Sequence, residues 1–225
     1  MFEDRVDAGR QLAAALSDVQ TAQQPVVVLG IPRGGVIVAA EVAAALHAPL
    51  DVCLTHKLTA PDNPELAIGA VAEDGTTLLD NELIRYLWVS SVYLQHEIEH
   101  QRVEMKRRAQ VYRRGHPPLS LIDRVVIVID DGVATGSTLI AALQAVRALP
   151  IARLIAAVPI GPALIKPKLQ HLADRVVMLF APRDFWSVSG HYEHFDQVTD
   201  EAVIAALTRF RPAASTKSAG PFSQH

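Results

Sequence analysis

Two adjacent carboxylates, Asp130 and Asp131, follow a run of five apolar residues and precede a loop of glycine, threonine and serine. If the apolar run is a strand of a parallel sheet, both side chains lie at its carboxyl end, where such sheets bind ligands. The backbone N–H groups and hydroxyls of residues 132–138 would then surround one phosphate group. The carboxylates would accept hydrogen bonds from neighbouring hydroxyls. The stretch predicts a ribose 5-phosphate site, although it would also suit a solvated turn before a capped helix.

Two common nucleotide-binding motifs do not fit this sequence. A P-loop requires a lysine after its last glycine, and here Gly136 is followed by Ser137. A dinucleotide-binding fold requires Gly-x-Gly-x-x-Gly after its first strand, and the sequence lacks that spacing. A site for one sugar phosphate is the interpretation that remains.

Residues 125–138 resemble the phosphoribosyl pyrophosphate motif of type I phosphoribosyltransferases, in which an apolar run and two acids precede a Thr-Gly-x-Thr loop. The sequence GIPRGG at residues 30–35 stands where that family has its pyrophosphate loop. Residues 56–58 and 64–70 are similar to a subgroup of the family whose acceptor is unsettled. The resemblance covers roughly residues 25–200.

The resemblance implies roles for the residues of both loops. Asp130 and Asp131 would hold the ribose hydroxyls, Lys57 would be a second pyrophosphate cation beside Arg33, and we predict Asp130, Asp131 and Lys57 as catalytic. The family's pyrophosphate loop often contains a non-proline cis peptide bond. The predicted substrate-binding residues are those of the two loops and two downstream aromatics: Arg33, Gly34, Gly35, Gly132, Val133, Ala134, Thr135, Gly136, Ser137, Thr138, Phe185 and Trp186.

The resemblance also implies a reaction, in which a nitrogen acceptor such as a nucleobase displaces pyrophosphate from C1 of the ribose. Mg would bridge the pyrophosphate and ribose oxygens, so no protein side chain is predicted as a metal ligand. The expected partners are phosphoribosyl pyrophosphate and a nitrogenous base or other small acceptor. A non-catalytic sensor of the same ligand, and a hydrolase of sugar phosphates, are the alternatives.

The acceptor side of the site is left open by the sequence. Ala134 stands where 6-oxopurine enzymes of the family carry a third acid. Glu65 and Glu73 are either replacements for that acid or solvated loop carboxylates. Phe185 and Trp186 either stack on a planar base or anchor the last helix on the sheet.

Two further patterns suggest other functions. The sequence HEIEH at residues 96–100 matches the zinc protease signature, with His191 or His194 as a third ligand, but its polar neighbours indicate a solvated surface. Basic residues at 106–108 and 113–114 either complement the dipole of a helix C-terminus or form a nucleic-acid patch. Zinc catalysis and nucleic-acid binding are therefore not expected.

The elements that would position these loops alternate between strands and helices, which predicts an α/β fold with a mostly parallel central sheet of about five strands. An Asp-Gly turn predicts an antiparallel hairpin at residues 67–79, and a long helix is expected at 91–114. The expected strands are 26–29, 50–54, 125–129, 154–159 and 176–180, and the expected helices of the core are 6–19, 36–46, 137–148, 162–172 and 200–210.

Residues 1–210 are expected to form one phosphoribosyltransferase domain, with a core at 25–180 and a small hood from 1–20 and 181–210, followed by a disordered tail at 211–225. A net charge of −3 gives no reason to expect nucleic acid or an anionic membrane as the main partner. A lone cysteine and the absence of a signal-like N-terminus predict a cytoplasmic protein. The apolar stripe of the long helix would pack on the core or form a homo-oligomer interface.

Overall fold

A computed structural model of the chain describes residues 1–19, 24–73 and 75–210. Its largest element is a sheet of five parallel strands in the order β2-β1-β6-β7-β8. The α/β class and the parallel central sheet predicted from the sequence are therefore confirmed. The strands are β1 (Val26–Gly30), β2 (Leu50–Val52), β6 (Val125–Ile129), β7 (Arg153–Ile160) and β8 (Arg175–Phe180).

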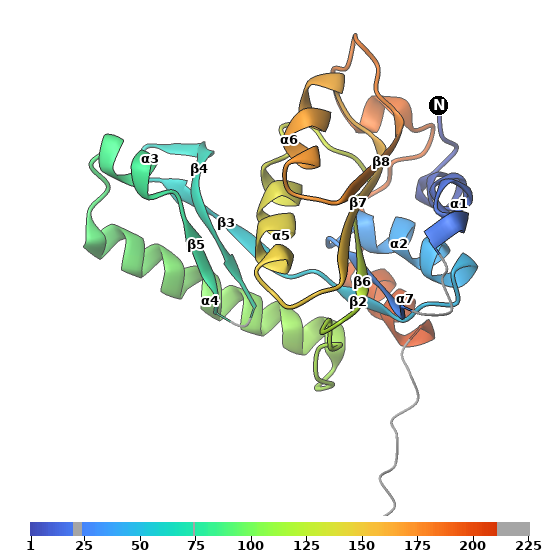
Figure 1. Cartoon of the computed structure of the whole chain (residues 1–225), viewed down its shortest axis with the longest axis horizontal. Helices are drawn as coiled ribbons and strands as arrows, with labels where there is room; N and C mark the ends of the chain where they lie inside the picture. Colours follow the sequence, from blue (N-terminus) through green and yellow to red (C-terminus); the bar gives the residue numbers. More distant parts are fainter. Residues whose placement is uncertain (20–23, 74, 211–225) are drawn as a thin grey trace, which may run out of the picture.

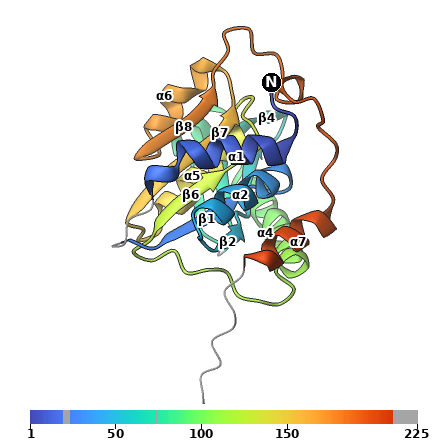
Figure 2. The same cartoon turned by 90° about the vertical axis from the view of Figure 1, so that its right-hand side faces the viewer.

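Helices cover both faces of this sheet, as Figures 1 and 2 show, and this explains why its strands are apolar without alternation. Val28 and Ile127 pack in the cluster under the first face, whereas Val27 and Val126 pack under the second. The helices are α1 (Arg5–Ala15), α2 (Gly34–Ala45) and α7 (Asp200–Arg209) on the first face, and α5 (Ser137–Arg147) and α6 (Lys166–Gln170) on the second. Short 3-10 turns lie at Ser17–Val19, Ala163–Ile165 and Ser189–His191.

The residues between β2 and β6 form an arm that projects from the core in Figure 1. It combines an antiparallel sheet in the order β3-β4-β5 with two helices. The predicted hairpin is thus part of a larger sheet, and the sequence analysis missed β3 and α3. The elements are β3 (Thr55–Ala60), β4 (Asn63–Ala72), β5 (Thr77–Leu79), α3 (Asn81–Tyr86) and α4 (Ser91–Arg113).

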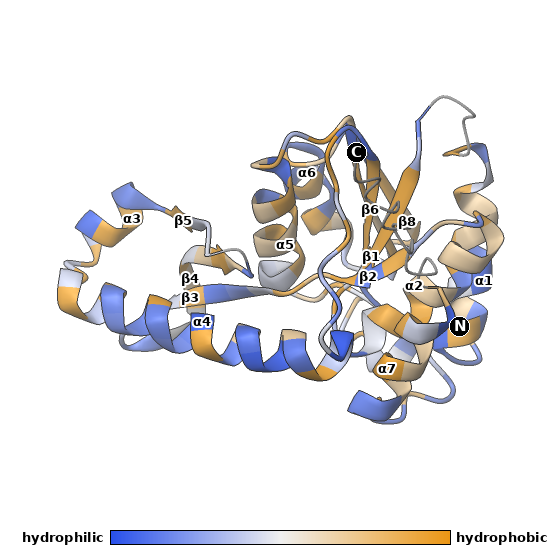
Figure 3. Ribbon diagram, turned by 90° about the horizontal axis from the view of Figure 1, so that it is seen from below, coloured by the Kyte–Doolittle hydropathy of each residue, from blue (hydrophilic) through white to orange (hydrophobic). Residues whose placement is uncertain are grey.

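The apolar stripe of α4 is used within the chain. Leu94, Ile98 and Met105 pack on the small sheet of the arm, and Tyr112 reaches the core cluster under α2. Figure 3 shows hydrophilic residues along much of the rest of α4, in contrast with the hydrophobic strands of the core. The predicted packing of the stripe on the core therefore holds only at its end, at Ala109 and Tyr112, and the rest of the stripe packs on the arm.

The start of the chain packs beside residues that follow β8. Phe2 pairs with Tyr192 in an isolated bridge, and their rings lie 5.2 Å apart in a small aromatic cluster. The predicted tail at 211–225 lies outside the described residues. None of the helices in the described part of the chain combines the length and the apolar character that crossing a membrane requires.

Candidate functional site

The two loops singled out in the sequence lie side by side at the carboxyl ends of β1 and β6. These strands are parallel neighbours, with Gly30 opposite Ile129, so their following loops emerge at the same edge. The N–H of Ile31 donates to the carbonyl of Ile129 at 2.8 Å and continues the pairing past β1. The Pro32–Arg33 peptide is cis, as the resemblance implied. We call this edge of the sheet, with its two loops, the strand-end site.

Two glycines allow the loops to touch. A Cβ atom on Gly34 would lie 1.9 Å from Oδ2 of Asp131, and one on Gly35 would lie 2.8 Å from the Cα of Asp130. A side chain at either position would force the neighbouring aspartate to shift, because real Cβ atoms do not approach other atoms so closely. Glycine at both positions therefore sets the distance between the loop at residues 30–35 and the aspartate pair.

Two helices begin at the strand-end site without a side-chain cap. Arg33 is the N-cap of α2 and Gly136 is the N-cap of α5, and neither cap makes a side-chain hydrogen bond. Gly136 adopts a φ of 83°, which glycine reaches without strain. The N–H of Ser137 donates weakly to Oγ1 of Thr135 at 3.5 Å, and the N–H of Val36 donates to the carbonyl of Arg33 at 3.2 Å. The other N–H groups of the two first turns remain available to an anion, and the helix dipoles favour negative charge there. The site has two such positions, at the starts of α2 and α5.

The aspartate pair is surrounded by groups that set its charge. Nε of Arg5 donates to Oδ2 of Asp131 at 2.7 Å, and both side chains are mostly buried. Burial raises the pKa of Asp130, and the charge of Asp131 raises that pKa further. The Tyr192 hydroxyl donates to the carbonyl of Asp131 at 2.5 Å. Asp131 is thus held by Arg5 and Tyr192, while Asp130 keeps a proton more readily than an ordinary aspartate.

A cavity of about 530 Å³ lies over these carboxylates. Arg5, Phe195 and Asp196 contribute to its wall, and the guanidinium of Arg5 stacks on the Phe195 ring with 3.7 Å between its Cζ and the ring centroid. The sequence analysis missed Arg5 and Asp196, because no motif joins positions so far apart in the chain. The position of Arg5 at the start of an amphipathic helix was the available signal.

A smaller crevice of about 210 Å³ adjoins this cavity, with which it shares Ile31, Pro32 and Thr138. Lys57 of β3 and Arg108 of α4 line it. The arm therefore brings two basic residues next to the loop at residues 30–35. Lys57 was predicted as a residue of the site, and Arg108 was not.

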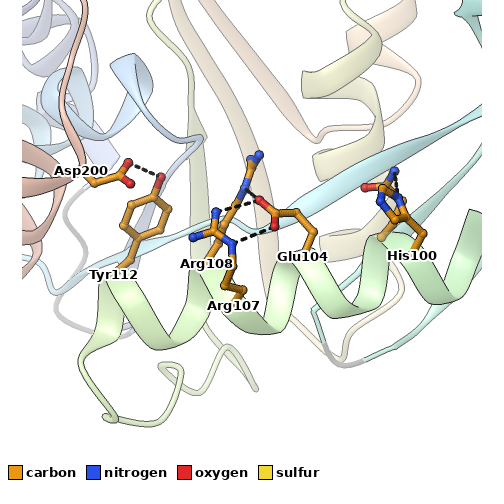
Figure 4. Close-up of polar contacts among 7 residues, drawn as sticks. His100, Glu104, Arg107, Arg108, Tyr112 and Asp200 are labelled. Carbon is orange, nitrogen blue, oxygen red and sulfur yellow. Dashed lines mark hydrogen bonds and ion pairs between the residues drawn. The ribbon is translucent and has the colours of Figure 1, made fainter.

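Arg108 is partly neutralised by an acid on its own helix. Glu104 accepts hydrogen bonds from Nε of Arg107 and Nε of Arg108, each at 2.8 Å (Figure 4). These hydrogen bonds lower the pKa of Glu104 to about 2. The crevice thus carries both signs of charge, and Arg108 has an acidic partner that a phosphate group would have to compete with.

The predicted substrate-binding residues lie in several different surroundings. Arg33, Gly34 and Thr138 line the cavity of about 530 Å³. Three others connect the loop to neighbouring elements or lie on the surface: Gly132 packs against Val188, Val133 donates its N–H to Ile160, and Ala134 is exposed. Thr135 and Ser137 bond to each other at 3.1 Å and line a separate cleft beside α5 and the arm.

Phe185 and Trp186 are not brought into the cavity over the aspartates. Phe185 stacks on His191 within the small aromatic cluster that contains Phe2 and Tyr192. Trp186 is 75% exposed and packs on Gly190. Their role in holding an acceptor stays a prediction, and the structure places Phe195 closer to the carboxylates.

The acids considered as replacements lie elsewhere. Glu73 forms an ion pair with Arg113, away from the aspartate pair. The side chain of Glu65 lies outside what the structure describes. Glu73 is therefore tied to a structural ion pair and is neither a solvated carboxylate nor a residue of the strand-end site.

The two patterns that suggested other functions also have a place in the structure. His96 and His100 lie on α4, and over residues 1–19, 24–73 and 75–210 no three His, Cys, Asp or Glu side chains are grouped to hold a metal ion. Of the basic residues at the end of α4, Arg107 and Arg108 pair with Glu104, and Arg113 is buried. These arginines are engaged within the chain.

Comparison with known proteins gives a consistent result. The sequence matches the family described as "Phosphoribosyl transferase domain" over residues 2–179. Relatives in two strains of Mycobacterium tuberculosis, provisionally named phosphoribosyl transferases, are 44% identical over 209 residues. The alignments cover 93% of this chain and 47% of each relative, so the chain spans about half the length of the curated relatives it matches.

A solved structure supports the arrangement of the whole described chain. The crystal structure of a protein from Thermus thermophilus aligns with a TM-score of 0.85 and 43% sequence identity. The alignment covers 94% of this chain and 99% of the Thermus chain. The combination of core and arm is thus found in a second protein.

Proposed function

Because the chain belongs to the phosphoribosyl transferase domain family, we propose that it transfers the phosphoribosyl group of phosphoribosyl pyrophosphate to a nitrogen acceptor. One observation carries the proposal. Two uncapped helix N-termini, those of α2 and α5, converge on an aspartate pair at the ends of adjacent parallel strands. A sugar with an anion at each end and hydroxyls between them matches this order of groups.

In this proposal each part of the substrate has its own partners. The N–H groups of residues 137–139 bind the 5-phosphate, and Asp130 and Asp131 accept hydrogen bonds from the ribose hydroxyls. Arg33 and the start of α2 bind the pyrophosphate, with Lys57 approaching from the crevice. These cations stabilise the negative charge that develops on pyrophosphate as its bond to C1 breaks.

Magnesium fits the chemistry of these groups. In this proposal Mg would be held mainly by oxygens of the substrate, the ligand type that this hard cation prefers, and the negative charge of Asp131 beside the ribose hydroxyls would favour its binding. When bound, Mg would neutralise charge on the pyrophosphate leaving group. Measuring Mg-dependent binding of the substrate by calorimetry, with Asp131→Asn as the variant, tests this role without relying on turnover.

The acceptor side is formed by the terminal segments. Asp196 is exposed and lines the cavity of about 530 Å³ together with Phe195. We assign to Asp196 the task of accepting the proton that the acceptor nitrogen loses, since Ala134 has no acid to offer. Phe195 supplies an aromatic surface beside it.

The test is a screen of purines, pyrimidines and other nitrogen acceptors for release of pyrophosphate in the presence of phosphoribosyl pyrophosphate and Mg. We expect release that depends on one class of acceptor and falls about 100-fold or more in Asp196→Asn, the range typical of a lost general base. Binding of the sugar diphosphate without release from any acceptor would contradict the transferase and favour a sensor of the same ligand.

A further inference from the structure

Arg108 of α4 lines the crevice of about 210 Å³ that adjoins the strand-end site. The wall of this crevice also includes Lys57 of β3 and two residues, Pro32 and Thr138, that line the cavity over the aspartates as well. A ligand in that cavity can therefore extend towards Arg108 without leaving the site. Phosphate oxygens are groups that a guanidinium binds well.

Arg108 and Arg33 lie near the same hydroxyl, although one belongs to the arm and the other to the core. Burial and the hydrogen bond to Asp200 raise the pKa of Tyr112 to about 12, and the nearby charges of Arg108 and Arg33 both oppose this rise. The position of Arg108 next to the loop at residues 30–35 is thus supported both by the lining of the crevice and by its charge.

Arg108 uses only part of its hydrogen-bonding capacity within the chain. Its Nε donates to Oε1 of Glu104 at 2.8 Å, and its two terminal nitrogens make no hydrogen bond with the described residues. Arg107, in contrast, turns two nitrogens to the same carboxylate, Nε at 2.8 Å and Nη2 at 2.9 Å (Figure 4). A guanidinium binds an oxyanion best through two parallel N–H donors. Arg108 therefore keeps such a pair of donors, Nη1 and Nη2, for a ligand.

Glu104 connects the two arginines and also lines the crevice. Hydrogen bonds from Arg107 and Arg108 lower the pKa of Glu104 to about 2, so this carboxylate is charged at neutral pH. An anion in the crevice is repelled by Glu104 and competes with it for Arg108. Arg107 is not among the described residues that line the crevice, and its two hydrogen bonds can hold Glu104 when Arg108 turns away. Release of Arg108 therefore does not leave the carboxylate unpaired.

We propose that Arg108 is a further pyrophosphate-binding residue and that Glu104 limits its availability by competing with the ligand for the guanidinium. In the unliganded chain Arg108 donates to Glu104. When pyrophosphate enters the crevice, Arg108 turns to the phosphate oxygens and Glu104 stays with Arg107. The inference rests on the proposed function for the identity of the ligand, and it adds two residues of α4 to which that function gives no role.

Inorganic pyrophosphate is the probe, titrated into the full chain by calorimetry in the presence of Mg and at fixed ionic strength. Arg108→Gln should weaken its binding by about 10-fold or more, the contribution of a charge-assisted hydrogen bond. Glu104→Gln should have the opposite sign and strengthen binding by roughly threefold to tenfold, because the competitor for Arg108 is lost. Thermal unfolding of each variant checks that the chain stays folded.

Lys106→Gln is the matched control for charge. Lys106 is an exposed cation two residues before Arg108 on the same helix, and it is not among the residues that line the crevice. Because solvent and salt screen exposed charges, the affinity of this variant should change by less than about twofold. A loss equal to that of Arg108→Gln would show that only the net charge of α4 matters, and would overturn the proposal.

The double variant Arg108→Gln with Glu104→Gln separates competition from repulsion. Without Arg108 there is nothing to compete for, and Arg107 still neutralises Glu104, so adding Glu104→Gln to Arg108→Gln should change affinity by less than about twofold. A gain of the same size as in the wild-type background would show that Glu104 acts through its charge alone, and would overturn the competition.

Failure of this inference can be told apart from failure of the proposed function. If the wild-type chain binds pyrophosphate and Arg108→Gln binds it equally well, Arg108 has no role and the proposed function stands. If Arg108→Gln loses affinity but no acceptor leads to release of pyrophosphate, the inference stands and the transferase does not. Absence of pyrophosphate binding by the wild-type chain would overturn the inference together with the pyrophosphate assignment of Arg33.

Discussion

At the strand ends, a methyl group on Gly34 would lie 1.9 Å from Asp131, whereas in the arm a methyl group on Gly75 would lie 3.5 Å from its nearest neighbour, Arg102. The strands of the two regions also differ in how tightly they are packed. Every residue of β6 is buried, whereas most residues of β3 are only partly buried. The core holds its loops by packing on both faces, and the small sheet of the arm has its own cluster against α4.

This difference separates two ways of positioning a functional group. Asp130 and Asp131 are fixed by the backbone of a fully buried strand. Lys57 and Arg108 depend on how the arm is attached to the core, through the buried ion pairs of Arg113 and the hydrogen bond between Tyr112 and Asp200 at 2.9 Å (Figure 4). Variants in the core should therefore change ligand affinity, and variants in the arm attachment should first change stability.

The largest effect is expected from Asp130→Asn combined with Asp131→Asn. Each carboxylate contributes charge-assisted hydrogen bonds of roughly 1.5–3 kcal/mol, so together their loss should weaken phosphoribosyl pyrophosphate by about 100-fold or more. Asp130→Asn alone should not lower the melting temperature, since burial raises the pKa of Asp130 and its charge therefore costs stability near neutral pH, whereas Asp131→Asn removes the mostly buried ion pair with Arg5 and should lower it. Calorimetry and thermal unfolding measure both quantities. If the double variant kept the affinity of the wild-type chain, Asp130 and Asp131 would not be the residues that bind the ribose hydroxyls.

The next largest effect is expected from breaking the buried ion pair that attaches the arm to the core. Arg113→Met leaves Asp51 buried without its guanidinium partner, which should cost about 3–5 kcal/mol in the free energy of unfolding. Urea denaturation measures the loss, and hydrogen exchange should show faster exchange in β3–β5 than in β1 and β6. The double variant Arg113→Met with Asp51→Asn is the control. It removes the unpaired negative charge of Asp51 and should recover part of the lost stability. Equal acceleration in both sheets would show that arm and core unfold together.

Two glycine variants compare the regions directly. Gly34→Ala should weaken phosphoribosyl pyrophosphate by about 10-fold or more, because overpacking of this kind costs roughly 1–3 kcal/mol and displaces Asp131. Gly115→Ala, between α4 and β6, has no atom within 4 Å but a φ of 82°. It should cost about 1–2 kcal/mol in stability and leave affinity unchanged. A loss of affinity in Gly115→Ala but not in Gly34→Ala would show that the close approach of Gly34 to Asp131 does not position the strand-end site.

The smallest effect is expected on the pH dependence of stability, from the ion pairs of Glu104 on the surface of α4. The pKa of Glu104 is lowered to about 2, so its ion pairs contribute stability above the unfolded-state pKa near 4.5, and the contribution is lost as pH falls towards 2. Because these pairs are partly exposed, the contribution should be less than about 1 kcal/mol. Glu104→Gln should remove this part of the pH dependence in thermal unfolding. An identical profile for both proteins would show that the pairs contribute nothing measurable.

The sequence was sufficient for the parts of the site that lie in local motifs. Residues 125–138 and 30–35 each combine an apolar strand with a loop, and parallel pairing brings them together. The contact of Arg5 with Asp131 could not be predicted, because it joins positions 126 residues apart without any periodic signal. The pairing of Asp51 with Arg113 was missed for the same reason, and β3 was missed because its half-buried residues resemble a loop.

In the proposed function, the strand-end site binds the sugar and the pyrophosphate of one substrate through separate groups. The most direct test is calorimetric titration of the wild-type chain and of Arg33→Ala with phosphoribosyl pyrophosphate and with ribose 5-phosphate, in the presence of Mg. We predict that the variant loses about 10-fold or more in affinity for phosphoribosyl pyrophosphate and keeps its affinity for ribose 5-phosphate, as the loss of one charge-assisted contact implies. Equal losses for both ligands, or no binding of either by the wild-type chain, would contradict this account.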